Sequence, residues 1–182
     1  MKLNQRIARE IKTADMVACG VSDPGLERSE NEDSIYLCEE GNFVLLADGM
    51  GGHERGAEAS KTAIEVIKKY FSPEVMSSEL LDITEGSGIP AEIACLESLV
   101  DSSVANANAQ VYELNQKIGA RLFMGTTVVG LLMVQGGYVL WFHVGDSRIY
   151  QWRGNELKCL TSDHSAYMEW KRKGKIGPAP KK

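Results

Sequence analysis

The sequence lacks any long hydrophobic run. None approaches the roughly 18 apolar residues that a membrane-spanning helix needs, and the opening MKLNQRIAREIKTAD has no apolar block of the kind found in signal peptides. The four cysteines are scattered and form no C-x-x-C pair, so we expect reduced thiols packed in the core. These absences predict a cytoplasmic protein that has no membrane partner.

An excess of positive charge is also absent. Lys and Arg number 20 against 25 Asp and Glu, which gives a formal net charge of -5. Nucleic acid is therefore not an expected partner. The remaining composition, 43% hydrophobic and 25% charged, is ordinary for a soluble globular protein. The length of 182 residues fits one domain with a sizeable core.

The start of the chain shows a helical pattern. Leu3, Ile7 and Ile11 recur at every fourth position, which predicts a short amphipathic helix. We therefore expect a lead-in helix over residues 1–15 and a single domain over residues 16–182.

The first half of the domain predicts strands followed by a helix. Apolar runs at 16–23, 33–40 and 42–48 are bounded by turn residues and indicate strands, the last two joined as a hairpin. Apolar residues at four-residue spacing predict a helix over residues 56–71. The polar stretch that follows, residues 72–90, is expected to be a connecting loop.

The second half predicts a long helix and then a block of strands. Apolar residues alternate threes and fours from Ile93 to Ile118, which marks the helix. The strands are expected at 126–134, 138–145, 147–153 and 156–161. Because the first two are apolar on both faces, we expect a sheet that is covered on both sides. Strands, then helices, then strands predict an α+β sandwich.

Three acidic motifs stand at the ends of these strands or in turns: NED at 31–33, DG at 48–49 and GDS at 145–147. Magnesium and manganese take oxygen ligands from carboxylates, backbone carbonyls and water. An aspartate at the end of an apolar strand supplies such a ligand from a rigid base, and the glycine after it lets a backbone carbonyl approach the ion. A single acidic turn is usually only solvated or a cap. Three together favour a divalent-metal site.

An arginine lies close to the first of these motifs. Arg28 precedes Glu32 and Asp33 by a few residues, and a guanidinium beside a metal site suits a phosphate, because it binds two phosphate oxygens at once. Spacing alone leaves open, and even favours, a surface arginine paired with Glu27 or Glu30.

Other patterns give weaker hypotheses. GMGGHERG, residues 49–56, matches neither common glycine-rich phosphate motif, so a nucleotide site is not expected. The histidines lie far apart without zinc spacing. His143 falls in an apolar strand and is typical of a core histidine, whereas a functional role and a loop-capping role are equally open for His164. The GTT of residues 125–127 has no base beside either threonine, so it is not a convincing nucleophile.

Five motifs occur in one order along the chain: GLERSENED, ADGMGGHERGAEAS, MGTT, HVGDSRIY and LTSDHS. Their order and spacing over residues 16–176 resemble the metal-dependent type 2C (PPM) serine/threonine protein phosphatases in their bacterial form. The resemblance implies a four-layer α-β-β-α sandwich, with two antiparallel sheets between outer helices. It also implies hydrolysis of phosphoserine and phosphothreonine by a water held between two Mn²⁺ or Mg²⁺ ions.

The same resemblance implies metal-site roles for particular residues. Asp48 would bridge the two metals, and Gly49 would offer its backbone carbonyl. Glu32 would act through a metal-bound water, and Asp33 would support the ligands. Asp146 corresponds to the aspartate of a third, weaker metal site.

Roles in substrate binding are implied as well. Arg28 would hold the substrate phosphate, and residues 161–177 would form a flap beside the site that shapes substrate access. The partners would be phosphorylated proteins and a cognate serine/threonine kinase.

The chain departs from the family pattern in two ways. Met50 stands where eukaryotic relatives carry a histidine proposed as general acid, so protonation of the leaving group would fall to water, and His53 would be structural. The family domain also continues past the flap with two further metal-binding aspartates and more strands, which residues 177–182 do not contain. Without these ligands a metal pair would bind weakly. A non-catalytic pseudophosphatase that binds phosphoproteins or a kinase is therefore the alternative.

Overall fold

The computed structural model describes residues 7–13, 16–40, 42–51, 54–81, 88–118 and 123–180. The strands are β1 (Ile7–Lys12), β2 (Val17–Ser22), β3 (Asp33–Leu37), β4 (Phe43–Met50), β5 (Gly125–Thr126), β6 (Val128–Val134), β7 (Tyr138–Val144), β8 (Tyr150–Arg153) and β9 (Glu156–Cys159). The helices are α1 (Glu54–Tyr70), α2 (Pro73–Leu81), α3 (Gly88–Ile118) and α4 (Ala166–Arg172), with a 3-10 turn η1 (Gln135–Gly137) between β6 and β7.

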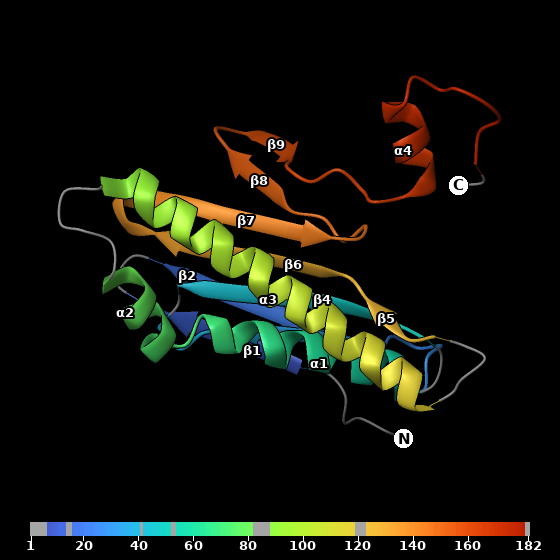
Figure 1. The fold of residues 1–182 in the computed structure, drawn as a ribbon, viewed down its shortest axis with the longest axis horizontal. Coiled ribbons are helices and arrows are strands. Elements are labelled where there is room, and N and C mark those ends of the chain that lie inside the picture. The colour runs from blue at the N-terminus through green and yellow to red at the C-terminus, as the bar shows by residue number, and fades with distance from the viewer. Residues whose placement is uncertain are drawn as a thin grey trace.

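A central antiparallel sheet organises the molecule (Figure 1). Its strands run in the order β3-β4-β6-β7, and the short β5 pairs with the last residues of β4. Helices α1 and α3 pack against each other on one face of this sheet, while the β1-β2 hairpin lies against β3 on the other face. The α+β class, with antiparallel sheets flanked by helices, is confirmed.

The core lies between the central sheet and the two long helices. Alternate residues of β4 and β6 point into it, because successive side chains of a strand face opposite sides. They meet the apolar stripes of α1 and α3, in which every third or fourth residue is buried. The largest buried side chains are Phe43, Ile67, Leu96 and Leu132. This helix-covered face holds the strands that carry the acidic motifs in fixed register.

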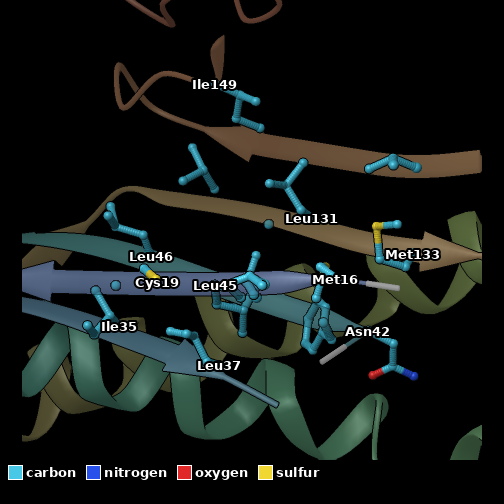
Figure 2. A pocket seen from close by; sticks show the side chains of 18 of the residues that line it. Met16, Cys19, Ile35, Leu37, Asn42, Leu45, Leu46, Leu131, Met133 and Ile149 are labelled. Carbon is cyan, nitrogen blue, oxygen red and sulfur yellow. The ribbon is translucent and has the colours of Figure 1, made fainter. Parts of the chain in front are cut away.

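The other face of the sheet is also apolar but less completely covered. Leu46, Met133 and Trp141 retain 37%, 40% and 37% of their exposure. A groove of about 540 Å³ separates this face from β2, and Figure 2 shows Cys19 of β2 on one side of it and Leu131 and Met133 on the other. The expected cover on both faces is therefore wrong for the described part of the chain, where only the helical side is closed.

The expected lead-in helix over residues 1–15 is wrong, because Ile7–Lys12 is the strand β1. All six of its residues pair with β2, from Ile7 opposite Ser22 to Lys12 opposite Val17. A continuous hairpin ladder of this length supplies backbone hydrogen bonds that outweigh a weak local helical pattern. Leu3, the first residue of that pattern, lies outside the described residues.

The expected loop over residues 72–90 is also wrong in its described parts. Residues 73–81 form α2, and α3 already begins at Gly88. The missed signal is Ser72-Pro73: the Ser72 hydroxyl accepts a hydrogen bond from the Val75 amide at 3.4 Å, and proline suits the first position of a helix. Residues 82–87 lie outside the described residues.

The remaining predicted elements are confirmed, with shifted ends. The strand expected at 147–153 begins only at Tyr150, since Ser147–Ile149 form an irregular connection out of β7. Figure 1 shows β8, β9 and α4 beyond the β7 edge of the sheet. Among the described residues, no helix is both long and apolar enough to cross a membrane.

Candidate metal and phosphate site

Two carboxylates meet across the β3-β4 pair. Asp33 opens β3 and Asp48 lies near the end of β4, and the strand register places them directly opposite each other. The pKa of Asp33 is raised, first by burial and then by the negative charge of Asp48. Two like charges at this distance favour either a shared proton or a cation that neutralises both.

A third carboxylate, that of Glu32, comes from the residue directly before Asp33. The Glu32 side chain is 13% exposed, and its Oε1 is buried without a hydrogen-bond partner among the described residues. The backbone is fixed here, because the Glu32 carbonyl accepts from the Gly49 amide at 3.2 Å and from the Ser60 hydroxyl at 2.6 Å. A buried oxygen left without a donor is unfavourable, so a metal-bound water or a metal at this position would satisfy it.

Glycine is required at two positions beside Glu32 because of space. A side chain at Gly49 would collide with the carbonyls of Glu32 and Gly56, and one at Gly56 would collide with the Glu32 carboxylate. The first turn of α1 is thereby held against the end of β4.

Arg28 reaches the same group of acids. Its Nη1 lies 3.5 Å from Oε2 of Glu32, while its side chain is 65% exposed. The structure thus pairs Arg28 with Glu32, rather than with Glu27 or Glu30. A guanidinium held loosely at the rim can turn toward a phosphate oxygen without losing a tight ion pair.

Asp146 is joined to the strand of Asp48 through a threonine that sequence reasoning missed. The Asp48 amide donates to the Thr127 hydroxyl at 3.2 Å, and the Thr127 amide donates to the Asp48 carbonyl at 2.9 Å. The Thr127 hydroxyl also lies 2.6 Å from that of Ser147, the neighbour of the exposed Asp146. The GTT pattern suggests only a nucleophile when the sequence is considered alone. Paired threonines at the start of a strand are equally suited to hold two loops together.

The segment after β9 is attached to the same loop. The His164 amide donates to the Gly145 carbonyl at 2.9 Å, and the Gly145 amide donates to His164 Nδ1 at 3.3 Å. The His143 ring stacks on the His164 ring with centroids 4.5 Å apart, and His143 Nε2 lies 3.0 Å from the Ser162 carbonyl. The loop-anchoring role of His164 is confirmed, and His143 is half-buried beneath the loop. His53 lies outside the described residues.

A bidentate ion pair completes the attachment. Arg148 Nε and Nη2 donate to the two carboxylate oxygens of Asp163 at 2.8 and 2.7 Å. The pKa of Asp163 is lowered, chiefly by these hydrogen bonds. Asp163 and His164, at the start of the segment expected to form the flap, are therefore held by contacts to Arg148 and Gly145, which lie on either side of Asp146.

The oxygen donors suit a hard divalent cation. Asp48, Asp33 and Glu32 would supply carboxylates and Gly49 a backbone carbonyl, close to where β4 meets the start of α1. Within the described residues, no three Asp, Glu, His or Cys side chains lie close enough together to hold a metal ion by themselves. A cation bound here would keep several waters, as Mg²⁺ and Mn²⁺ commonly do.

Comparison with known proteins identifies the family. The family model described as Protein phosphatase 2C matches residues 27–169. The chain belongs to this family. It is 30% identical over 158 residues to the serine/threonine phosphatase stp of Listeria monocytogenes, covering 85% of this chain and 57% of the relative.

Solved structures agree with this assignment. The serine/threonine phosphatase PstP/Ppp of Mycobacterium tuberculosis superposes with a TM-score of 0.64 at 29% identity, covering 96% of this chain and 60% of that one. A PstP catalytic domain solved in complex with two manganese ions gives a TM-score of 0.63 at 30% identity, covering 96% and 62%. The chain thus spans a little over half the length of the curated stp relative, and its own activity is a separate question.

Proposed function

We propose that this chain forms part of a protein phosphatase that hydrolyses phosphoserine and phosphothreonine in proteins with the help of Mn²⁺ or Mg²⁺. The observation that carries the proposal is that Asp33 and Asp48 lie directly opposite each other on β3 and β4, while Glu32, the residue before Asp33, has a buried oxygen without a hydrogen-bond partner among the described residues. Family membership and the manganese-bound relative support it. The activity is expected in the cytoplasm, on phosphorylated proteins, in opposition to a cognate kinase.

Each residue has a distinct part in this proposal. Two Mn²⁺ or Mg²⁺ ions, when bound, would supply an activated water and neutralise charge on the phosphoryl group. Asp48 and the Gly49 carbonyl would hold them directly, whereas Glu32 would accept from a metal-bound water and Asp33 would hold Asp48 in position. Arg28 donates to the phosphate oxygens, which fixes the substrate in line for attack.

Two further residues refine the proposal. Asp146, on the loop fixed by the contact between Thr127 and Ser147, would be the ligand of a third, weaker ion. Met50, which is 65% exposed at the end of β4, has no proton to give, so water protonates the leaving seryl or threonyl oxygen. Replacing Met50 with leucine should therefore leave the pH dependence of hydrolysis unchanged.

The direct test is hydrolysis of an aryl phosphate by the purified chain with and without Mn²⁺. The proposal expects activity that requires Mn²⁺ and is lost in Asp48→Asn. Because Asp48 is exposed, the variant should stay folded, which circular dichroism and the thermal midpoint can verify. A folded wild-type chain that is inactive at every Mn²⁺ concentration would refute catalysis by this chain.

One observation favours a second candidate, a non-catalytic phosphoprotein-binding module. The described residues hold no ready-made group of three metal-binding side chains. In that case a phosphoserine peptide binds with Arg28 as its main contact, and Mn²⁺ gives no turnover. Peptide binding that is lost in Arg28→Ala, without any hydrolysis, would support this candidate over the first.

A further inference from the structure

The chain has two regions of opposite charge that its net charge conceals. Residues 1–165 carry 14 basic and 24 acidic residues, whereas residues 166–182 carry six basic residues and one acidic residue. A phosphorylated protein segment is strongly negative and is repelled by the first region at a distance. The second region, which contains α4, is the part of the molecule whose charge attracts such a segment.

The backbone presents this positive charge outward. After α4 the chain turns back, with the Lys175 amide donating to the Trp170 carbonyl at 2.9 Å and Trp170 Nε1 donating to the Gly177 carbonyl at 3.0 Å. Lys175 adopts φ 61°, a left-handed conformation that glycine or asparagine normally occupies. A lysine in this position is unfavourable for the backbone, and such outliers point to a role for the side chain.

Two of these cations have no ion-pair partner in the part of the chain that the structure describes. Lys173 pairs with Glu169 at 2.8 Å, and Lys171 lies over the Tyr167 ring at 5.4 Å. Arg172 and Lys175 are exposed, and neither lies in an ion pair. The neighbouring Ile176 is 81% exposed. We call Arg172, Lys175 and Ile176 the flap surface.

The flap surface is connected to the candidate site by short contacts. Ser165 caps α4 through a hydrogen bond from the Met168 amide at 3.2 Å, and the preceding His164 is bonded to Gly145, the neighbour of Asp146. Figure 1 shows α4 beyond the end of β7, and the register brings this end of β7 next to the start of β6. These contacts join α4 to the loop of Asp146, which the Thr127 hydroxyl connects to Asp48.

We propose that the flap surface binds acidic residues that flank the phosphorylated residue of a protein substrate. This proposal rests on the proposed function, and it adds a substrate class: phosphoserine or phosphothreonine followed or preceded by Asp or Glu. Arg172 and Lys175 pair with the acidic side chains, while Ile176 contacts an apolar neighbour. The affinity gained this way falls with salt, since the contacts are solvent-exposed.

The test uses the 182-residue chain in EDTA, so that binding is measured without hydrolysis. Fluorescence anisotropy compares a labelled phosphoserine peptide flanked by aspartates with the same peptide flanked by serines. The variant is Arg172→Gln/Lys175→Gly, in which glycine also suits the left-handed backbone. The matched control is Arg9→Gln/Lys12→Gln, which removes the same charge from exposed positions of β1.

The flap variant should weaken binding of the acidic peptide by roughly fivefold or more, with little effect on the serine-flanked peptide. The control should leave both affinities unchanged. Equal binding of the two peptides, or equal loss in flap variant and control, would overturn the proposal. Binding to phosphatidylserine vesicles in place of the acidic peptide would overturn it too. If the chain binds the acidic peptide but shows no Mn²⁺-dependent hydrolysis of an aryl phosphate, the proposed function alone is refuted.

Discussion

The carboxylate end of β3 and β4 and the flap are held in opposite ways. At the carboxylates, backbone meets backbone: Gly49 approaches the carbonyls of Glu32 and Gly56 with no room for a side chain. At the segment expected to form the flap, one backbone hydrogen bond joins His164 to Gly145, and side chains make the rest of the attachment, through the Arg148–Asp163 ion pair and the contact of the His143 and His164 rings. The first region is therefore rigid and intolerant of substitution. The second can change its sequence without disturbing the ligands, which suits a role in choosing substrates.

The largest effect should follow substitution at the tight backbone contact. Gly49→Ala places a methyl group against two carbonyls that cannot move independently, and we expect a loss of about 3 kcal/mol in the free energy of unfolding. Urea denaturation measures it. Gly125→Ala is the matched control, because its new methyl would meet only the Met50 side chain at 3.7 Å. Equal stability of the two variants would contradict the packing argument.

Arg28 should affect catalysis without affecting stability. Its side chain is 65% exposed, so Arg28→Ala should leave the thermal midpoint unchanged while kcat/KM for an aryl phosphate falls roughly tenfold to hundredfold. Arg28→Lys should recover only part of the loss, because an ammonium group cannot bind two oxygens in parallel. A large fall in stability would instead assign Arg28 a structural role.

Thr127 should connect the two regions. Thr127→Val removes the hydroxyl between Asp48 and Ser147, which should cost about 1 kcal/mol of stability. It should also weaken Mn²⁺ binding, which a purely structural threonine would not do. Thr127→Ser, which keeps the hydroxyl, should restore the Mn²⁺ affinity measured by calorimetry. A valine variant with normal Mn²⁺ affinity would show that the link does not position Asp48.

Asp33 should make the stability of the fold decrease as the pH rises, whereas an ordinary stabilising carboxylate makes it increase. Its pKa in the folded chain lies above the ordinary value of 3.8, so the folded state binds more protons in the window above 3.8. Stability of the metal-free chain therefore falls as the pH rises through this window. Asp33→Asn should remove this fall and raise neutral-pH stability by up to about 0.5 kcal/mol. The check is to measure the thermal midpoints of the wild-type chain and of Asp33→Asn in EDTA from pH 3.5 to pH 7. A difference between the two midpoints that stays constant across this range would contradict the prediction.

The smallest effect is expected at the flap. Arg148→Ala removes the exposed ion pair to Asp163, and the thermal midpoint of the whole chain should stay the same. The flap should nevertheless open more often, so limited trypsin digestion should cleave faster after Lys171 and Arg172. Digestion at the wild-type rate would show that the histidine contacts alone hold the flap.

The sequence predicted the elements of the core better than its edges. The helix patterns of α1 and α3 and the alternation in β4 and β6 follow directly from burial on one side, so they were found. The strand β1 does not follow from the four-residue spacing, because its conformation is set by pairing with the neighbouring strand β2, which the spacing of apolar residues does not report. The helix α2 was missed because a polar composition concealed the Ser72-Pro73 start signal.

The sequence predicts which residues belong to the candidate site better than it predicts how those residues are arranged in space. Strand ends and glycines identified Asp33, Asp48 and Gly49, and the register brings the two aspartates face to face. The role of Thr127 depends on three segments meeting in space, and no spacing rule contains that information. The roles in metal or phosphate binding stay predictions for all of the site residues: Arg28, Glu32, Asp33, Asp48, Gly49 and Asp146.

The most direct test of the central claim is a calorimetric titration of the metal-free chain with Mn²⁺, alongside Asp48→Asn and the exposed-surface control Lys12→Gln. We expect heat of Mn²⁺ binding in the wild-type chain and in the control, and no such heat in Asp48→Asn. Equal Mn²⁺ binding by wild type and Asp48→Asn, or no binding by a folded wild-type chain, would contradict the claim that these carboxylates form a metal site.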